Sequence, residues 1–323
     1  MSSSDPGGRR FLRWAAALAL ASVAVLTAAA AAVDPLGVLA ATPAGTLRLC
    51  ADGPKTTDER AWAPMLYAAR PAPEAIIGSS RALRGFSRPA GREIVNLSLS
   101  GAGLSEIAGL ARDAAATGRL RRVWLVLDFP AFVAPSASEG GGGTRSGPAP
   151  RGEAARMATG LASPVAWAGL FDVARRPREC LHPGRGPSGF MVAPDEPGHR
   201  AMSLRQAAML RGRLARPDGE RRARYASAMT LLETLAGDLR GQGVEVVLVA
   251  APFAPDYERQ AAAAGLEPWR TRWLADLDAA AAATGARVLL PSIGEADFMD
   301  ATHFRPAVGD RLLDARPLAP PPG

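Results

Sequence analysis

Three residues of this chain have the types and the order that nucleophilic catalysis by a serine needs. Ser80 follows the apolar residues 76–78 on a turn after a predicted strand, while Asp300 and His303 lie three positions apart much later in the chain. A serine hydroxyl is a weak nucleophile at its ordinary pKa, so it needs a base beside it and a third group that fixes the tautomer of that base. The pattern therefore predicts a hydrolase or acyltransferase triad. Ser80 Oγ and a ring nitrogen of His303 should lie within hydrogen-bond reach.

A third segment, residues 95–103, runs from a predicted strand into a glycine-rich turn and then into a helix with apolar periodicity. Together the three segments resemble the SGNH/GDSL hydrolase superfamily, over residues 73–313. The resemblance implies that Ser80 is the nucleophile, Asp300 the orienting acid and His303 the base. It also implies an oxyanion hole formed by the N–H groups of Ser80 and Gly101. Ser79 stands where the superfamily carries the aspartate of its Gly-Asp-Ser block.

The Gly-Ser-Ser sequence of residues 78–80 is similar to that of membrane-anchored relatives in this superfamily. These are the D-alanine transfer protein of teichoic acid synthesis and the alginate O-acetyltransferase group. Many of them begin with one membrane helix followed closely by Asp-Pro, as residues 34–35 do here. The resemblance implies an envelope polysaccharide or another acyl acceptor as substrate, and a membrane-bound O-acyltransferase as partner.

The chain departs from the superfamily pattern after the third predicted strand. The superfamily has Gly-x-Asn-Asp there, whereas residues 126–130 read Val-Leu-Asp-Phe-Pro. Losing one oxyanion donor typically costs about 3–4 kcal/mol of transition-state stabilisation, so either another donor replaces the asparagine or activity is reduced or absent. Asp128 at this position and Arg81 beside the nucleophile are candidate substrate-binding residues. Arg81 has two interpretations: it binds an acidic sugar, or it pairs with a neighbouring carboxylate.

Each segment also has a structural interpretation without catalysis. The serines after the first strand could cap a helix, and Asp300 could cap the last helix with His303 in its first turn. The rival function is a catalytically silent SGNH-like domain that binds glycan or scaffolds an envelope assembly. The order of the segments favours catalysis, because each follows a predicted strand of an open α/β sheet, where ligands bind at the carboxyl ends of strands.

Hydrophobic periodicity predicts alternating strands and helices, and hence a doubly wound, five-stranded parallel sheet of the SGNH/flavodoxin-like kind. Continuous apolar runs typical of doubly buried strands cover residues 75–78, 93–99, 122–128, 244–250 and 286–291. Apolar residues at three- and four-residue spacing predict helices over residues 105–117, 221–241, 269–283 and 305–313. Glycines at 118, 243 and 285 are expected to end three of these helices.

Residues 130–224 replace an ordinary crossover connection. The segment begins with the flexible glycine run 140–143 and offers a helix at 164–175. Connections of this length are usually functional or disordered. Two interpretations stay open: a lid or acceptor-binding subdomain over the triad, and an insertion that serves packing alone.

The amino-terminal sequence predicts a membrane segment. Three arginines at positions 9, 10 and 13 precede the uncharged residues 14–33, which as a helix would be about 30 Å long and so able to cross the hydrocarbon core. The arginines should stay in the cytoplasm, which places the rest of the chain in the periplasm or at the outer face. A cleaved signal peptide is the alternative, because the alanines at 28–32 offer cleavage sites.

The predicted organisation therefore has five parts. They are a cytoplasmic N-terminus (1–13), a transmembrane anchor or signal peptide (14–33), a linker (34–72), an SGNH-like domain with its insertion at 130–224 (73–318) and a tail (319–323).

The sequence gives no support for a nucleic-acid partner, a metal or a cofactor. The net charge is +7, but Lys55 is the only lysine, and the densest basic run, 205–224, has only Tyr225 as an aromatic neighbour for base stacking. A polyanionic glycan or an anionic lipid surface stays open as a partner. His182 and His199 lack a ligand cluster and are expected to be solvated. Whether the two cysteines, Cys50 and Cys180, pair in an oxidising compartment also stays open.

Overall fold

A computed structural model of the chain describes residues 6–33, 59–135, 188–190 and 215–314, together with the single residues 167, 208 and 212. Several predictions lie outside these ranges: the fate of Cys50 and Cys180, the solvation of His182 and His199, the glycine run 140–143, nearly all of the helix at 164–175, and most or all of the linker (34–72), the insertion (130–224) and the tail (319–323).

The centre of the fold is a five-stranded sheet in which every strand runs parallel to its neighbours. The strand order is β2-β1-β3-β4-β5, which is the order of a doubly wound α/β fold with its switch point between β1 and β3. The strands are β1 (Glu74–Gly78), β2 (Ile94–Asn96), β3 (Arg122–Leu127), β4 (Glu245–Ala250) and β5 (Arg287–Leu289).

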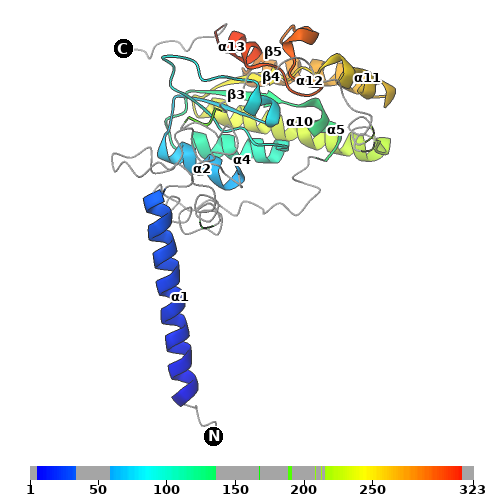
Figure 1. The fold of residues 1–323 in the computed structure, drawn as a ribbon. Helices are drawn as coiled ribbons and strands as arrows, with labels where there is room; N and C mark the ends of the chain where they lie inside the picture. Colours follow the sequence, from blue (N-terminus) through cyan, green and yellow to red (C-terminus); the bar gives the residue numbers. More distant parts are fainter. Residues whose placement is uncertain are drawn as a thin grey trace.

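The apolar sequence of the central strands reflects burial on both faces. All positions of β1 and β3 are buried, and so are all but the first of β4, whereas the edge strand β5 is partly exposed. One face packs against α2 (Glu59–Ala69), α4 (Leu104–Ala115), α10 (Asp218–Gly241) and α12 (Glu267–Thr284). The other face packs against α3 (Ser80–Arg84) and α13 (Pro306–Asp314). Figure 1 shows α4 and α10 on one side of the sheet and α13 on the other.

The five strands and the four predicted helices (α4, α10, α12 and α13) agree with their predicted bounds to within a few residues. Gly285 ends α12 in the left-handed conformation (φ 71°), as expected for a residue without a side chain to clash. Four helices were not predicted: α2, α3, α5 (Phe129–Val133) and α11 (Pro255–Ala263), with the 3-10 turn η2 (Glu295–Asp297). α5 occupies the start of the predicted insertion, because Pro130 fits the first turn of a helix.

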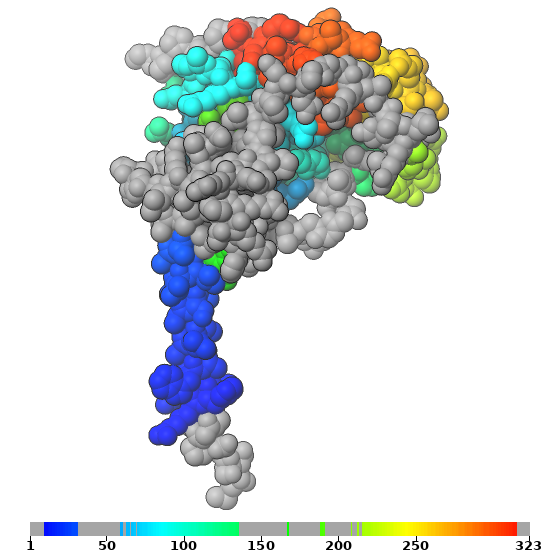
Figure 2. Space-filling model, viewed as in Figure 1, coloured from blue at the N-terminus to red at the C-terminus, as the bar shows by residue number. Residues whose placement is uncertain are grey.

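The described residues contain one helix long and apolar enough to cross a membrane. It is α1 (Pro6–Val33), whose residues Arg10–Ala31 have a mean hydropathy of 2.0. Large side chains along it are exposed by 70% or more, among them Phe11, Trp14 and Leu18. Figures 1 and 2 show α1 projecting away from the α/β domain. An anchor and a signal sequence share these features, so the two sequence interpretations both stand.

Candidate active site

Ser80 is the first residue of α3, shortly after the end of β1, and the neighbouring Ser79 has a structural role. Ser79 is the N-cap of α3, is 4% exposed, and accepts a hydrogen bond from the Arg81 N–H at 3.3 Å. A capping serine has its oxygen committed to the helix, which is the expected use of this residue type. The hydroxyl that faces the imidazole is therefore that of Ser80.

The structure brings Ser80, His303 and Asp300 together in one line of hydrogen bonds. His303 Nε2 lies 3.0 Å from Ser80 Oγ, and His303 Nδ1 lies 2.8 Å from Asp300 Oδ2 and 3.0 Å from Oδ1. The expected hydrogen-bond distance between Ser80 and His303 is thus met, across 223 positions of sequence. In this arrangement the carboxylate holds the Nδ1–H tautomer and leaves Nε2 to accept a proton from the serine.

A small hairpin holds His303 in place. Phe298 and Phe304 form an antiparallel bridge, and the Met299 N–H donates to the His303 carbonyl at 2.9 Å. The Phe304 ring is fully buried and packs edge-on against Phe86, with ring centroids 6.0 Å apart. Because α13 begins only at Pro306, the alternative in which Asp300 caps that helix and His303 lies in its first turn is wrong.

Asp300 accepts hydrogen bonds from its own loop as well as from the imidazole. Its Oδ1 receives the N–H of Thr302 at 2.7 Å, the N–H of His303 at 2.8 Å and the Thr302 hydroxyl at 2.9 Å. Burial alone would raise the pKa of Asp300. The hydrogen bond and charge of His303, with the two N–H groups, outweigh burial and hold the pKa well below its ordinary value. The acid is therefore ionised when the imidazole needs it. Thr302 was not predicted, although it stands inside the Asp-x-x-His segment.

The turn carrying Gly101 lies beside the turn carrying Ser80. The Leu99 N–H donates to the Gly78 carbonyl at 3.0 Å, which joins the segment after β2 to the end of β1. Gly101 has φ 65°, a left-handed conformation that suits glycine. Among the described residues, neither the Ser80 N–H nor the Gly101 N–H donates to another group. Both predicted oxyanion donors are thus uncommitted within the part of the chain that the structure describes.

Two residues of α2 form hydrogen bonds with this turn, and the sequence did not predict these contacts. The Glu59 carboxylate accepts from the Ser100 N–H at 2.5 Å and from its hydroxyl at 3.1 Å. Arg60 donates to the Ser100 carbonyl at 3.2 Å and to Glu106 at 2.6 Å. No local sequence signal points to these contacts, because α2 lies about forty positions before the turn.

Arg81 and Asp128, the two candidate substrate-binding residues, contact each other. The Arg81 side chain is only 7% exposed, and its Nη1 lies 2.9 Å from Asp128 Oδ1. Its Nε donates to the Thr302 carbonyl at 2.8 Å. Pairing with a neighbouring carboxylate was the alternative interpretation, and it is the one found, because a buried guanidinium needs a compensating charge close by.

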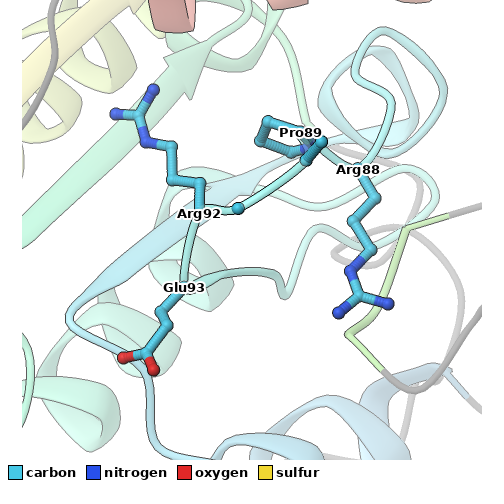
Figure 3. A pocket seen from close by; sticks show the side chains of 6 residues that line it. Arg88, Pro89, Arg92 and Glu93 are labelled. Carbon is cyan, nitrogen blue, oxygen red and sulfur yellow. The ribbon is translucent and has the colours of Figure 1, made fainter.

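A pocket elsewhere on the domain does not belong to this site. It is lined by the loop before β2, residues 88–93, in which the side chains of Arg92 and Glu93 point apart (Figure 3). Arg92 is bonded to Glu74, the first residue of β1, so this loop lies at the amino ends of the strands. Ligands of open parallel sheets bind at the carboxyl ends, where Ser80 lies.

Fold and site together define a class: a parallel α/β protein with a Ser-His-Asp constellation at the carboxyl ends of its strands. Comparisons of the chain with protein-family models, with curated proteins and with solved structures gave no match.

Proposed function

We propose that this chain is an SGNH-type serine O-acyltransferase or esterase that works through an acyl-enzyme on Ser80. The observation that supports the proposal most is the hydrogen-bonded line from Ser80 Oγ through His303 to Asp300. A Ser-His pair at 3.0 Å with its own half-buried acid is the arrangement that activates a hydroxyl at neutral pH. A glycan-binding or scaffolding domain has no need of such an arrangement.

The proposed reaction has two halves with one covalent intermediate. Ser80 Oγ attacks the acyl carbonyl carbon while His303 Nε2 takes the hydroxyl proton, and that proton then leaves with the departing alcohol. Water or a sugar hydroxyl next attacks the acyl-serine, giving its proton to His303, which returns it to Ser80 Oγ. The N–H groups of Ser80 and Gly101 would stabilise the oxyanion in both halves.

The third oxyanion donor of the superfamily has no counterpart after β3. Asp128 stands in that segment, and its carboxylate accepts from Arg81 rather than offering an N–H to substrate. Two backbone donors should still support turnover. The absence of the third donor should lower the rate by about a hundredfold or more. We therefore expect slow hydrolysis of simple esters.

The proposed placement of the domain outside the membrane favours transfer over hydrolysis. A domain held outside the membrane by α1 would lie beside an acyl donor supplied through the membrane, and an envelope polysaccharide is the abundant hydroxyl acceptor there. A membrane-bound O-acyltransferase is the partner that this scheme needs. To test it, the full-length protein in detergent would be given a short-chain p-nitrophenyl ester with and without a soluble envelope polysaccharide. Acyl groups on the glycan that depend on Ser80 support transfer; p-nitrophenol release alone indicates an esterase.

The orientation of the chain makes a separate prediction. Arg10 and Arg13 precede the apolar part of α1, so the amino end should stay inside and the domain should be exported. A reporter fused after Gly323 is expected to be active only outside the cytoplasm. Cytoplasmic activity of the reporter would contradict this topology, and recovery of a shortened, soluble chain would identify α1 as a cleaved signal.

A further inference from the structure

Arg81 is the residue after the candidate nucleophile, yet its side chain joins four separate parts of the chain. Its Nη1 pairs with Asp128 after β3, and its Nε donates to the carbonyl of Thr302 in the hairpin. The guanidinium carbon, Cζ, lies over the Phe253 ring, which follows β4, at 3.7 Å from its centroid, and 5.3 Å from the centroid of Tyr257 on α11. These partners are 47 to 221 positions away.

The contact with Thr302 has a particular consequence for the candidate base. The Thr302 carbonyl belongs to the peptide unit that leads directly into His303. The other side of the same loop is held by Asp300, which accepts from the N–H groups of Thr302 and His303. The peptide unit between Thr302 and His303 therefore has its carbonyl hydrogen-bonded to Arg81 and its N–H hydrogen-bonded to Asp300. These two contacts hold the backbone before His303 from both sides.

Arg81 also belongs to the same short helix as Ser80. Because α3 starts at Ser80, a contact from Arg81 to the hairpin ties the backbone of the nucleophile to the backbone of the base. The side chain is 7% exposed and its charge is balanced by Asp128, so the link is shielded from water and from salt. The Ser80 to His303 distance therefore depends on a guanidinium that does not itself take part in the reaction.

We propose that Arg81 is a positioning residue that sets the distance between Ser80 Oγ and His303 Nε2; the inference rests on the proposed acyl-transfer function. Only arginine fits this role. The planar fork donates to Asp128 and Thr302 while its Cζ lies over the Phe253 ring, whereas a lysine ammonium is a point charge without a fixed fork.

The test compares Arg81→Lys with Arg92→Lys in the full-length protein in detergent. Arg92 is a matched control, since it also pairs with a carboxylate (Glu74, through two hydrogen bonds), donates to a main-chain carbonyl (Leu313) and lies over an aromatic ring (Trp124), at the other end of the sheet. With p-nitrophenyl acetate, Arg81→Lys should lower kcat about a hundredfold with little change in KM, because a displacement of about 1 Å costs that much. Arg92→Lys should keep the wild-type kcat even if its melting temperature falls.

A second measurement does not depend on turnover. In protein labelled with ¹⁵N-histidine, the Nδ1–H signal of His303 bonded to Asp300 would be assigned by its loss in His303→Ala. The signal is expected in wild type and Arg92→Lys and should be lost or shifted in Arg81→Lys. If Arg81→Lys does not fold, Asp128→Asn replaces it, with an expected loss of about tenfold in kcat, since it weakens only one of the contacts.

The outcomes separate the two proposals. Wild type without Ser80-dependent turnover but with an Arg81-dependent His303 signal refutes the proposed function and leaves the positioning role in place. A folded Arg81→Lys protein with wild-type kcat and an unchanged His303 signal overturns the positioning role. So does an equal loss of kcat in Arg92→Lys, because the effect would then be one of general stability.

Discussion

Replacing Ser80 with alanine is expected to lower kcat for p-nitrophenyl acetate by about 10⁴-fold or more, and His303→Ala should cost about as much. Both variants remove one end of the 3.0 Å hydrogen bond that prepares the nucleophile. The double variant should be hardly slower than either single one, because residues that act as a unit lose their effect together. Initial rates of p-nitrophenol release by the full-length protein in detergent measure this directly.

Ser79→Ala is the matched control for that experiment. The two serines are adjacent, but Ser79 caps α3, so its replacement should cost about 1 kcal/mol of stability and leave substantial activity. Equal rates in wild type and Ser80→Ala, or abolition by Ser79→Ala with Ser80→Ala active, would contradict the assignment of the nucleophile. Unchanged envelope acylation in cells that carry Ser80→Ala would favour the glycan-binding or scaffolding alternative.

Gly309→Ala is expected to destabilise the domain by about 3 kcal/mol. A Cβ at this position of α13 would come within 2.1 Å of the Gly85 carbonyl oxygen and 2.4 Å of Phe86 Cδ1. The nearest atom is backbone, which cannot move aside cheaply, so α13 would have to shift away from α3. Since α13 directly follows the hairpin that carries His303, the candidate site should be disturbed together with the fold.

Gly237→Ala serves as the control for this prediction. Gly237 also lies in a helix, α10, but it is exposed and a Cβ there would meet no atom within 4 Å. Alanine should therefore stabilise the protein by about 0.5–1 kcal/mol. The free energy of unfolding of both variants would be measured by urea denaturation. A Gly309→Ala protein as stable as wild type would show that α3 and α13 are not packed as described.

The parts of the fold that followed from sequence are those where burial leaves a strong pattern. β1, β3 and β4 are almost fully buried and therefore read as continuous apolar runs, and the long helices carry apolar residues at helical spacing. The helices that were missed are short or contradict the usual rules. α2 has Pro64 inside it, and α3 and α5 have five residues each, too few to show a period.

In the candidate site, too, some features could be predicted from sequence and others could not. The Ser-His-Asp constellation was predicted because its three residues have distinctive types and occur in the order Ser, Asp, His along the chain. The contacts that hold it could not be predicted, since they join segments that only the tertiary fold brings together. Arg81 reaches the Thr302 carbonyl across 221 positions, and Glu59 reaches Ser100 across 41. A carbonyl acceptor also leaves no trace in the residue types, so sequence alone could not predict the contact between Arg81 and Thr302.

The central claim is that Ser80 carries an acyl group during the reaction. Full-length protein would be mixed with p-nitrophenyl acetate, quenched in acid within seconds and digested, and the peptides would be mapped by mass spectrometry. We predict an acetyl group on Ser80 in wild type, none in Ser80→Ala, and little in His303→Ala. Wild-type protein that releases p-nitrophenol while Ser80 stays unmodified, or that acetylates equally well without His303, would contradict the account.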